Sequence, residues 1–427
     1  MFSNLRARIG QGPLALLGGL AAYGSAELAV RIVRLCTVVI IARQLAPDIV
    51  GVAALSLTLF ELIRVLANIG VGQRIIVAPA ELLDATCNAS RRLFWAWCAF
   101  VALVQCVAAA VLVTLFAQPM AGAMLAVLSL VYVFMPAGLV QCYLLMREGR
   151  AGTTARTTAA QTIADQLLTT GLLLAWPSPW SIVLPKLLTA PIWLVMTRHA
   201  RPWVANSAAG HVPMVALFRA GLSVLATDML IAVRTQVDKL IIASTLGVSA
   251  LGTYYFAFNA GIGIVSSLIA AFGTVIFPSL CAQAPGVARS QKLAMAAVLG
   301  AGLFVPIIAA QSLLAPLYVP LIFGAHWAHA APLISILCLA GIPMLAGTLT
   351  TQWLRAHNRA HVDAVGGVLA CVAALSGLLA GAQMGSLSAA AFGWVAGLAL
   401  AILPFATFIL RPALPARRPS TSEQVAQ

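Results

Sequence analysis

Hydrophobic residues recur along this chain in long runs, separated by short stretches that hold most of the charges. A helix needs about 20 apolar residues to cross a bilayer, and a sheet can span lipid only as a closed barrel. The pattern therefore predicts twelve membrane-spanning helices. Their approximate bounds are 14–42, 50–71, 93–117, 121–146, 157–175, 180–197, 214–243, 250–278, 292–317, 331–353, 362–382 and 387–410.

Basic residues sort onto alternate sides of these predicted helices. Of 25 Lys and Arg, 18 fall in the N-terminus, five alternate loops and the C-terminal tail, whereas the other loops hold only Arg43. Lys and Arg are retained on the cytoplasmic side, so both termini are predicted to be cytoplasmic. Trp176, Trp180 and Trp327 fall on the opposite side, where an interfacial aromatic belt is expected. The 18 basic residues are Arg6, Arg8, Arg74, Arg91, Arg92, Arg147, Arg150, Arg156, Arg198, Arg201, Arg219, Arg289, Lys292, Arg355, Arg359, Arg411, Arg417 and Arg418.

Composition agrees with a membrane protein and leaves little room for a soluble domain. The chain is 62% hydrophobic and 8% charged, against about 45–50% and about 25% in soluble domains. The net charge of +14 is scattered through short loops, so no nucleic-acid partner is expected. No phosphate loop, nucleophile elbow or long outward loop is present, which argues against an enzyme and against a cofactor.

Neither the cysteines nor the histidines predict a metal site. The eight cysteines are scattered without a C-x-x-C pair, as expected of small apolar packing residues. His326-x-x-His329 and His357-x-x-x-His361 have spacings that place two imidazoles on one helical face. No carboxylate or cysteine completes either set locally, so we interpret them as surface histidines.

The two halves of the chain align at one gapless offset of 201 residues. Gly51 falls on Gly252 and Gly72 on Gly273, and the pattern of span, short turn, glycine and span is shared. An offset that covers six spans keeps their orientation. We therefore predict two six-helix lobes, 1–210 and 211–411, related by a parallel pseudo-two-fold axis along the membrane normal, with the site between them. The remaining segment, 412–427, is predicted to be a disordered cytoplasmic tail.

Charged residues inside the predicted spans point to a functional pathway. Each Lys or Arg at mid-bilayer costs about 2.5–3.5 kcal/mol, so such residues mostly face protein or water. The acids among them are counter-ions or carriers of coupling protons or Na⁺, and the sequence leaves both open. The basic residues are Arg31, Arg34, Arg64, Lys186, Arg234 and Lys239, and the acids are Glu27, Glu61, Asp165, Asp228 and Asp238.

Spacing and depth suggest partners for several of these charges. Counted from the outward turn, Arg31 and Glu61 lie at one depth, and Glu27 and Arg64 at another, which predicts a ladder of two ion pairs between the first two spans. Arg234 and Asp238 are four residues apart and can pair on one helix. Near the outward end, Lys186 is expected to extend its ammonium group to the interface.

Two segments resemble a known family. Ala42-Arg-Gln-Leu-Ala-Pro-Asp-Ile-Val-Gly51 resembles the "ARxLGPxxFG" turn of polysaccharide and O-antigen flippases, with Ala46 and Val50 where that pattern has Gly and Phe. Asp238-Lys-Leu-Ile-Ile-Ala-Ser-Thr-Leu-Gly247, followed by Leu251-Gly-Thr-Tyr254, resembles their seventh-span pattern. These proteins belong to the multidrug/oligosaccharidyl-lipid/polysaccharide exporter superfamily.

The resemblance implies a flippase that moves undecaprenyl-diphosphate-linked oligosaccharide across a bacterial inner membrane by alternating access around a cationic cavity. The basic residues within the spans, Arg31, Arg34, Arg64, Arg234 and Lys239, are then candidate ligands of the anionic diphosphate, because guanidinium groups match phosphate geometry. The alternative is structural ion pairing that fixes the register of the helices. The implied partners are this lipid-linked oligosaccharide and membrane lipids; a polysaccharide polymerase and chain-length machinery are left open.

Three alternatives remain. A multidrug-type antiporter of the same superfamily would favour acids over the cluster of arginines. A peptidoglycan-precursor flippase would resemble a fourteen-span chain. A membrane-embedded polysaccharide polymerase would need a large outward loop or a soluble domain. The glycan, the coupling ion and the oligomeric state are not predicted.

Overall fold

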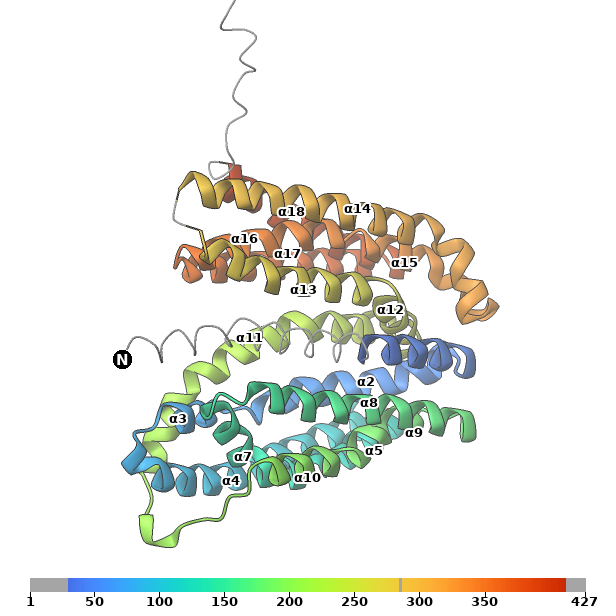
Figure 1. Ribbon diagram of the computed structural model, residues 1–427. Coiled ribbons are helices and arrows are strands. Elements are labelled where there is room, and N and C mark those ends of the chain that lie inside the picture. Colours follow the sequence, from blue (N-terminus) through green and yellow to red (C-terminus); the bar gives the residue numbers. More distant parts are fainter. Residues whose placement is uncertain (1–29, 284–285, 412–427) are drawn as a thin grey trace, which may run out of the picture. The chain divides into compact units, whose positions relative to one another are not determined.

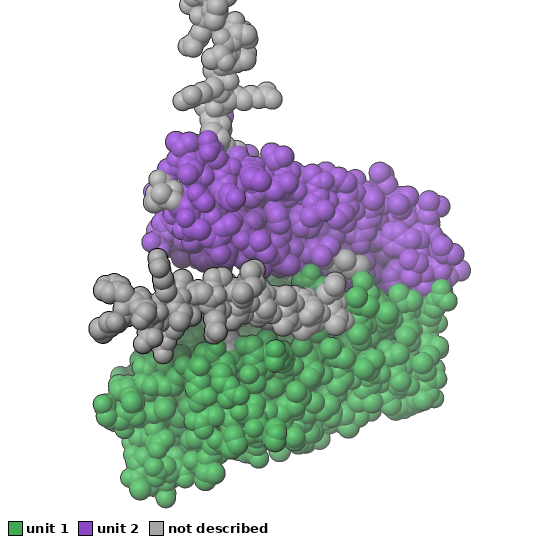
Figure 2. All heavy atoms as spheres, in the orientation of Figure 1, with its two compact units in different colours: residues 1–240 green, residues 241–427 purple. Residues whose placement is uncertain are grey.

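Every regular element in the described part of the chain is a helix, which confirms the predicted all-α fold. The computed structural model describes residues 30–283 and 286–411 (Figure 1). Most of the first predicted span, Glu27 and the predicted tail therefore lie outside the described residues. The chain divides into two compact units, Met1–Leu240 and Ile241–Gln427 (Figure 2). This division falls 30 residues after the predicted lobe boundary at 210/211, which stays a prediction about the repeat.

The described part of unit 1 begins with helical residues 30–44, and the unit ends within a long helix, α11. Proline occupies the first turn of α2, α5, α7 and α10, where its missing N–H costs no hydrogen bond. The elements are α2 (Pro47–Leu66), α3 (Val71–Val77), η1 (Ala80–Leu82), α4 (Leu83–Thr114), α5 (Pro119–Leu128), α6 (Val131–Phe134), α7 (Pro136–Arg147), α8 (Ala151–Ala175), α9 (Trp180–Leu188), α10 (Ala190–Ala200), η2 (Ser207–Ala209) and α11 (Met214–Leu246).

Unit 2 begins at Ile241, within α11, and its other described elements are all helices. Its elements are α12 (Val248–Ala260), α13 (Ile262–Cys281), α14 (Val287–Phe323), η3 (Ala325–Ala330), α15 (Ala331–Cys338), α16 (Gly341–Ala356), α17 (Ala360–Gln383) and α18 (Leu387–Leu410).

The chain is a multi-pass membrane protein. Seven described helices are long and apolar enough to cross a bilayer, or nine if each of two bent pairs, α5–α7 (52°) and α12–α13 (42°), forms one span. Two further predicted spans, α8 and α11, are helical but are not among these helices. The first predicted span lies largely outside the described residues, so the number twelve stays a prediction.

Packing within each unit repeats the same order of neighbours. In unit 1, α2 packs on α5, α3 on α7, α4 on both α5 and α7, and α8 on α9 and α10. In unit 2, α12 packs on α15, α13 on α16, α14 on both α15 and α16, and α17 on α18. This correspondence supports the duplication inferred from the offset of 201 residues, and the two-fold relation stays a proposal.

Helices α17 and α18 approach each other backbone to backbone. Each carries a G-x-x-x-G pair, Gly377 with Gly381 and Gly393 with Gly397. A Cβ added at Gly377 would overlap the carbonyl oxygen of Gly393, and the reverse also holds. Small residues at this spacing let membrane helices pack closely.

In unit 1, the bend between α2 and α3 supports the first half of α11. Gly70 caps α3 with a φ of +69°, a conformation that glycine adopts without strain. A Cβ added at Gly221 of α11 would overlap the carbonyl oxygen of Ile69. At the other end of α3, Arg147 Nη1 donates to the carbonyl oxygens of Ile75, Ile76 and Ala78 at 3.0, 3.0 and 2.6 Å.

One interfacial residue was predicted wrongly. Trp327 is 0% exposed, because the turn η3 folds its indole against Phe256, with ring centroids 4.0 Å apart. It is a core residue of unit 2 and not part of an aromatic belt, whereas Trp176 is 51% exposed.

Candidate functional site

Charged side chains gather near the middle of several helices in unit 1. Glu61 and Arg64 lie within two residues of the midpoint of the segment formed by α2 and α3. Asp165 lies two residues from the middle of α8, and Asp228 two residues from the middle of α11. At a rise of about 1.5 Å per residue, these groups lie close to mid-helix, where contact with lipid is most costly.

Glu61 and Arg64 pair with each other on α2. Arg64 donates from Nε and Nη2 to Glu61 Oε2 at 3.0 and 2.6 Å, and the side chains are 46% and 29% exposed for Arg64 and Glu61. The predicted ladder assigned both residues to partners on the first span instead. The i,i+3 spacing brings the two groups together on one helix face. The Glu27 half of the ladder lies outside the described residues.

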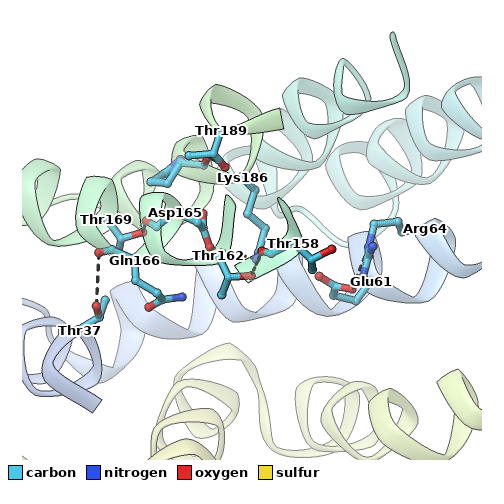
Figure 3. A network of polar contacts seen from close by, with 11 residues as sticks. Thr37, Glu61, Arg64, Thr158, Thr162, Asp165, Gln166, Thr169, Lys186 and Thr189 are labelled. Carbon is cyan, nitrogen blue, oxygen red and sulfur yellow. Dashed lines mark hydrogen bonds and ion pairs between the residues drawn. The ribbon is translucent and has the colours of Figure 1, made fainter. Parts of the chain in front are cut away.

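Asp165 and Lys186 form a second ion pair, between α8 and α9. Lys186 Nζ lies 3.5 Å from Asp165 Oδ2, with side chains 31% and 11% exposed. The other carboxylate oxygen, Oδ1, is buried and has no hydrogen-bond partner in the described part of the chain. The ammonium of Lys186 is thus directed to Asp165, which corrects the expectation that it extends to the interface. Figure 3 shows this pair beside Glu61 and Arg64.

Several threonine side chains and that of Gln166 lie around these charged groups (Figure 3). On α8, Thr162 donates to the carbonyl oxygen of Thr158 at 2.9 Å. Thr37, which is 1% exposed, lies 3.3 Å from the carbonyl oxygen of Gln166 and 3.2 Å from the hydroxyl of Thr170. These hydroxyls tie the helix of residues 30–44 to α8 and explain why α8 is too polar to pass for an ordinary lipid-facing span.

Four of the charged residues singled out in the sequence lie along α11. Asp228 Oδ2 accepts a 2.6 Å hydrogen bond from Asn68 Nδ2, and Asn68 Oδ1 accepts one of 3.2 Å from the Tyr143 hydroxyl. Lys239 Nζ lies 3.3 Å from Asp238 Oδ1, and both side chains are less than a tenth exposed. Arg234 is exposed on the same helix.

The predicted site residues thus fall into small clusters. Arg31 is half-buried and Arg34 exposed on the helix of residues 30–44. The structure brings together Glu61 with Arg64, Asp165 with Lys186, and Asp238 with Lys239. Sequence reasoning missed the hydrogen-bonded link from Tyr143 on α7 through Asn68 to Asp228 on α11, because no spacing rule joins the break between α2 and α3 to these two helices.

The described residues hold no group of three His, Cys, Asp or Glu side chains arranged to bind a metal ion. His326 and His329 are exposed, and His357 Nδ1 lies 2.9 Å from the carbonyl oxygen of Trp353.

Comparison with known proteins identifies the family. The polysaccharide biosynthesis protein family matches residues 40–356. The succinoglycan biosynthesis transport protein ExoT of Rhizobium meliloti (strain 1021) is 25% identical over 313 residues, 71% of this chain and 62% of that protein. This chain therefore spans less than two thirds of that relative's length.

Solved structures share the fold. The lipid II flippase MurJ in an inward closed conformation matches with a TM-score of 0.74 and 12% identity, over 91% of this chain and 87% of that one. An inward-facing multidrug resistance MATE family transporter of the MOP superfamily matches with a TM-score of 0.65 and 12% identity, over 91% and 98%. Together with the family match, this fold confirms the resemblance found in the sequence: the chain belongs to the polysaccharide biosynthesis protein family.

Proposed function

We propose that this protein moves an undecaprenyl-diphosphate-linked oligosaccharide from the inner to the outer leaflet of a bacterial inner membrane for polysaccharide export. The family match and the likeness to a succinoglycan biosynthesis transport protein support the pathway. The fold shared with a lipid II flippase supports transport of a lipid-linked substrate.

The observation that carries the proposal is the set of cationic side chains within the predicted spans. Arg34, Arg64 and Arg234 are exposed, and Arg31 is half-buried. Each would cost about 2.5–3.5 kcal/mol if it faced hydrocarbon at mid-bilayer. A hydrated passage avoids that cost, and a guanidinium binds phosphate through two parallel N–H groups. We assign these four arginines to the diphosphate.

Lys239 is the weakest of the proposed substrate ligands. Its side chain is 7% exposed and lies against Asp238, which is 3% exposed. Its ammonium also donates to the carbonyl oxygen of Thr235 at 2.6 Å. An ammonium with these partners is available to a diphosphate only after a rearrangement of α11.

Transport would proceed by alternating access, with both termini cytoplasmic. An anionic head that leaves toward the outer leaflet moves in the favourable direction in the membrane potential, at about 2.3 kcal/mol per charge per 100 mV. Asp165 is the best-placed acid for coupling, because one of its oxygens is buried without a hydrogen-bond partner in the described part of the chain. Glu27 and Asp228 are the other coupling candidates, and Glu61 and Asp238 act as counter-ions.

The test is complementation of a deletion strain. Loss of the gene should leave lipid-linked oligosaccharide on the inner leaflet, and wild-type protein should restore export. Arg34→Ala, Arg64→Ala and Arg234→Ala should each insert normally yet fail to restore it. Arg359→Ala is the matched control, because Arg359 is exposed at the start of α17, outside the predicted spans. Full export by all three span variants would refute the assignment.

A multidrug-type antiporter is the second candidate, favoured by the fold shared with the MATE family transporter. Export of a cationic dye by the reconstituted protein would support it, and such export should then be insensitive to the three arginine substitutions.

A further inference from the structure

A pocket in unit 1 lies apart from the polar network of α2, α8 and α9. Its volume is about 540 Å³, within the range of about 300–1,000 Å³ found for small-molecule sites. Helix α4 contributes Arg91 and Trp95, α7 contributes Gln141, and the end of α10 and the loop after it contribute Arg198 and Trp203. The pocket thus combines two guanidinium groups, two indoles and an amide.

The pocket carries an uncompensated positive charge. None of the described residues that line it is acidic. Arg198 Nε donates to the carbonyl oxygen of Ala137 at 3.0 Å, which holds the guanidinium at the pocket wall and leaves its terminal N–H groups for a ligand. The neighbouring Arg201 forms an ion pair with Glu148, with 2.6 Å between Nε and Oε1, and does not line the pocket. Two guanidinium groups that share one pocket repel each other until an anion lies between them.

The apolar part of the pocket continues onto an exposed helix face. Trp95 is 43% exposed, and farther along α4 Leu103 and Val107 are 62% and 56% exposed. Val204, at the rim of the pocket, is 86% exposed. Large apolar side chains exposed in this way along a membrane helix face acyl chains, and tryptophan is enriched at the boundary with the headgroups.

Arg91 and Arg198 are also predicted to lie at the boundary between acyl chains and headgroups. Arg91 lies two residues before the predicted span 93–117, and Arg198 one residue after the predicted span 180–197. Both are predicted to border the membrane on its cytoplasmic side, where anionic lipids are concentrated.

We propose that this pocket binds the phosphate headgroup of an anionic phospholipid of the cytoplasmic leaflet. Arg91 and Arg198 hold the phosphate, Gln141 and Trp203 contact the headgroup, and the acyl chains lie along the exposed face of α4. The site is separate from the proposed transport pathway, and its test does not depend on transport.

Binding is measured on the purified full-length protein in detergent. Dioleoyl-phosphatidylglycerol is titrated against dioleoyl-phosphatidylcholine, with thermal unfolding and retention of lipid in native mass spectrometry as readouts. A hydrogen bond from an arginine to a charged phosphate contributes at least about 1.5 kcal/mol, which is about tenfold in affinity. Arg91→Gln should therefore weaken phosphatidylglycerol binding about tenfold, and Arg91→Gln with Arg198→Gln ~100-fold.

The matched control is Arg92→Gln, which removes the same charge from an exposed position next to Arg91 that does not line the pocket. It should bind as wild type. Arg91→Gln alone keeps the experiment decisive if the double variant is unstable, because it leaves the bond from Arg198 to Ala137 intact. Unchanged phosphatidylglycerol binding in Arg91→Gln would overturn the proposal. Equal stabilisation by phosphatidylcholine or by inorganic phosphate would overturn the lipid assignment.

Discussion

Replacing Lys186 by methionine tests whether the pair between α8 and α9 stabilises unit 1. The substitution keeps the length of the side chain and removes the ammonium that lies 3.5 Å from Asp165 Oδ2. The carboxylate, 11% exposed, is then left without its counter-ion, and its Oδ1 is already without a hydrogen-bond partner in the described part of the chain.

The expected loss lies between two limits. Removal of one partner from a fully buried pair costs about 3–5 kcal/mol, whereas an exposed pair contributes about 0.2–1 kcal/mol. The Asp165 side chain is close to the buried limit, but Lys186 is 31% exposed, so water screens part of the interaction. We expect about 2–3 kcal/mol, which corresponds to a fall in Tm of about 4–12 °C at the scaling of domains of 150–250 residues.

The assay is thermal unfolding of the purified protein in detergent, followed as a double-mutant cycle. Asp165→Asn combined with Lys186→Met removes both charges and should recover most of the loss, because a neutral pair leaves no stranded ion. Lys292→Met, at an exposed position on α14, controls for the loss of a lysine. A Tm for Lys186→Met close to that of Lys292→Met, or a double variant no more stable than Lys186→Met, would refute the reasoning.

Three further predictions concern unit 1. Gly221→Ala should lower Tm by several degrees, because the added Cβ overlaps a backbone carbonyl. The control Gly171→Ala, whose Cβ meets nothing within 4 Å, should leave Tm unchanged or raise it. Equal effects of the two substitutions on Tm would contradict the packing of α11. Arg147→Met should destabilise by about 1.5–3 kcal/mol, because a charge-assisted anchor of three carbonyl groups is lost; denaturant unfolding measures this, and a loss below 0.5 kcal/mol on the same scale would contradict it. The hydrogen bond from Arg201 lowers the pKa of Glu148, so this pair stabilises above the carboxyl's unfolded pKa of about 4.3 and its contribution is lost as pH falls through the lower folded pKa. Glu148→Gln should therefore be slightly less stable than wild type at pH 7 and equal to it in acid, and a difference that persists below pH of about 3 would count against this pair.

Hydropathy predicted the helices well because lipid imposes one rule on every span: it needs about 20 mostly apolar residues to cross the bilayer. Each predicted span from 50–71 onward lies on a helix or a bent pair of helices in the structure. The same rule selected the candidate site residues, since the charges of Arg64 and Asp165 stand out in apolar sequence. The bends between α2 and α3 and between α5 and α7 were not predicted, because they depend on how these helices pack on their neighbours.

Partner choice was harder to predict. Depth counted from a turn places Glu61 level with Arg31. It cannot decide whether Glu61 pairs with a residue on the neighbouring helix or with Arg64 on its own helix, because that choice depends on the side-chain rotamers. The pair of Asp165 and Lys186 was within reach of the same counting, applied to the hairpin at Trp176–Trp180. Their depths differ by about five residues, or about 7 Å, which a lysine side chain directed back toward Asp165 can span.

The glycine contact between α17 and α18 has a mechanical consequence. Where two backbones touch through Gly377 and Gly393, no rotamer change is available to accommodate sliding. The two helices must then move together as one rigid pair during any rearrangement of unit 2. Bending of unit 2 then occurs at interruptions of its helices such as Gly261, where α12 and α13 meet at 42°. A disulfide engineered across α17 and α18 should therefore leave transport intact, whereas one that spans the α12–α13 bend should arrest it.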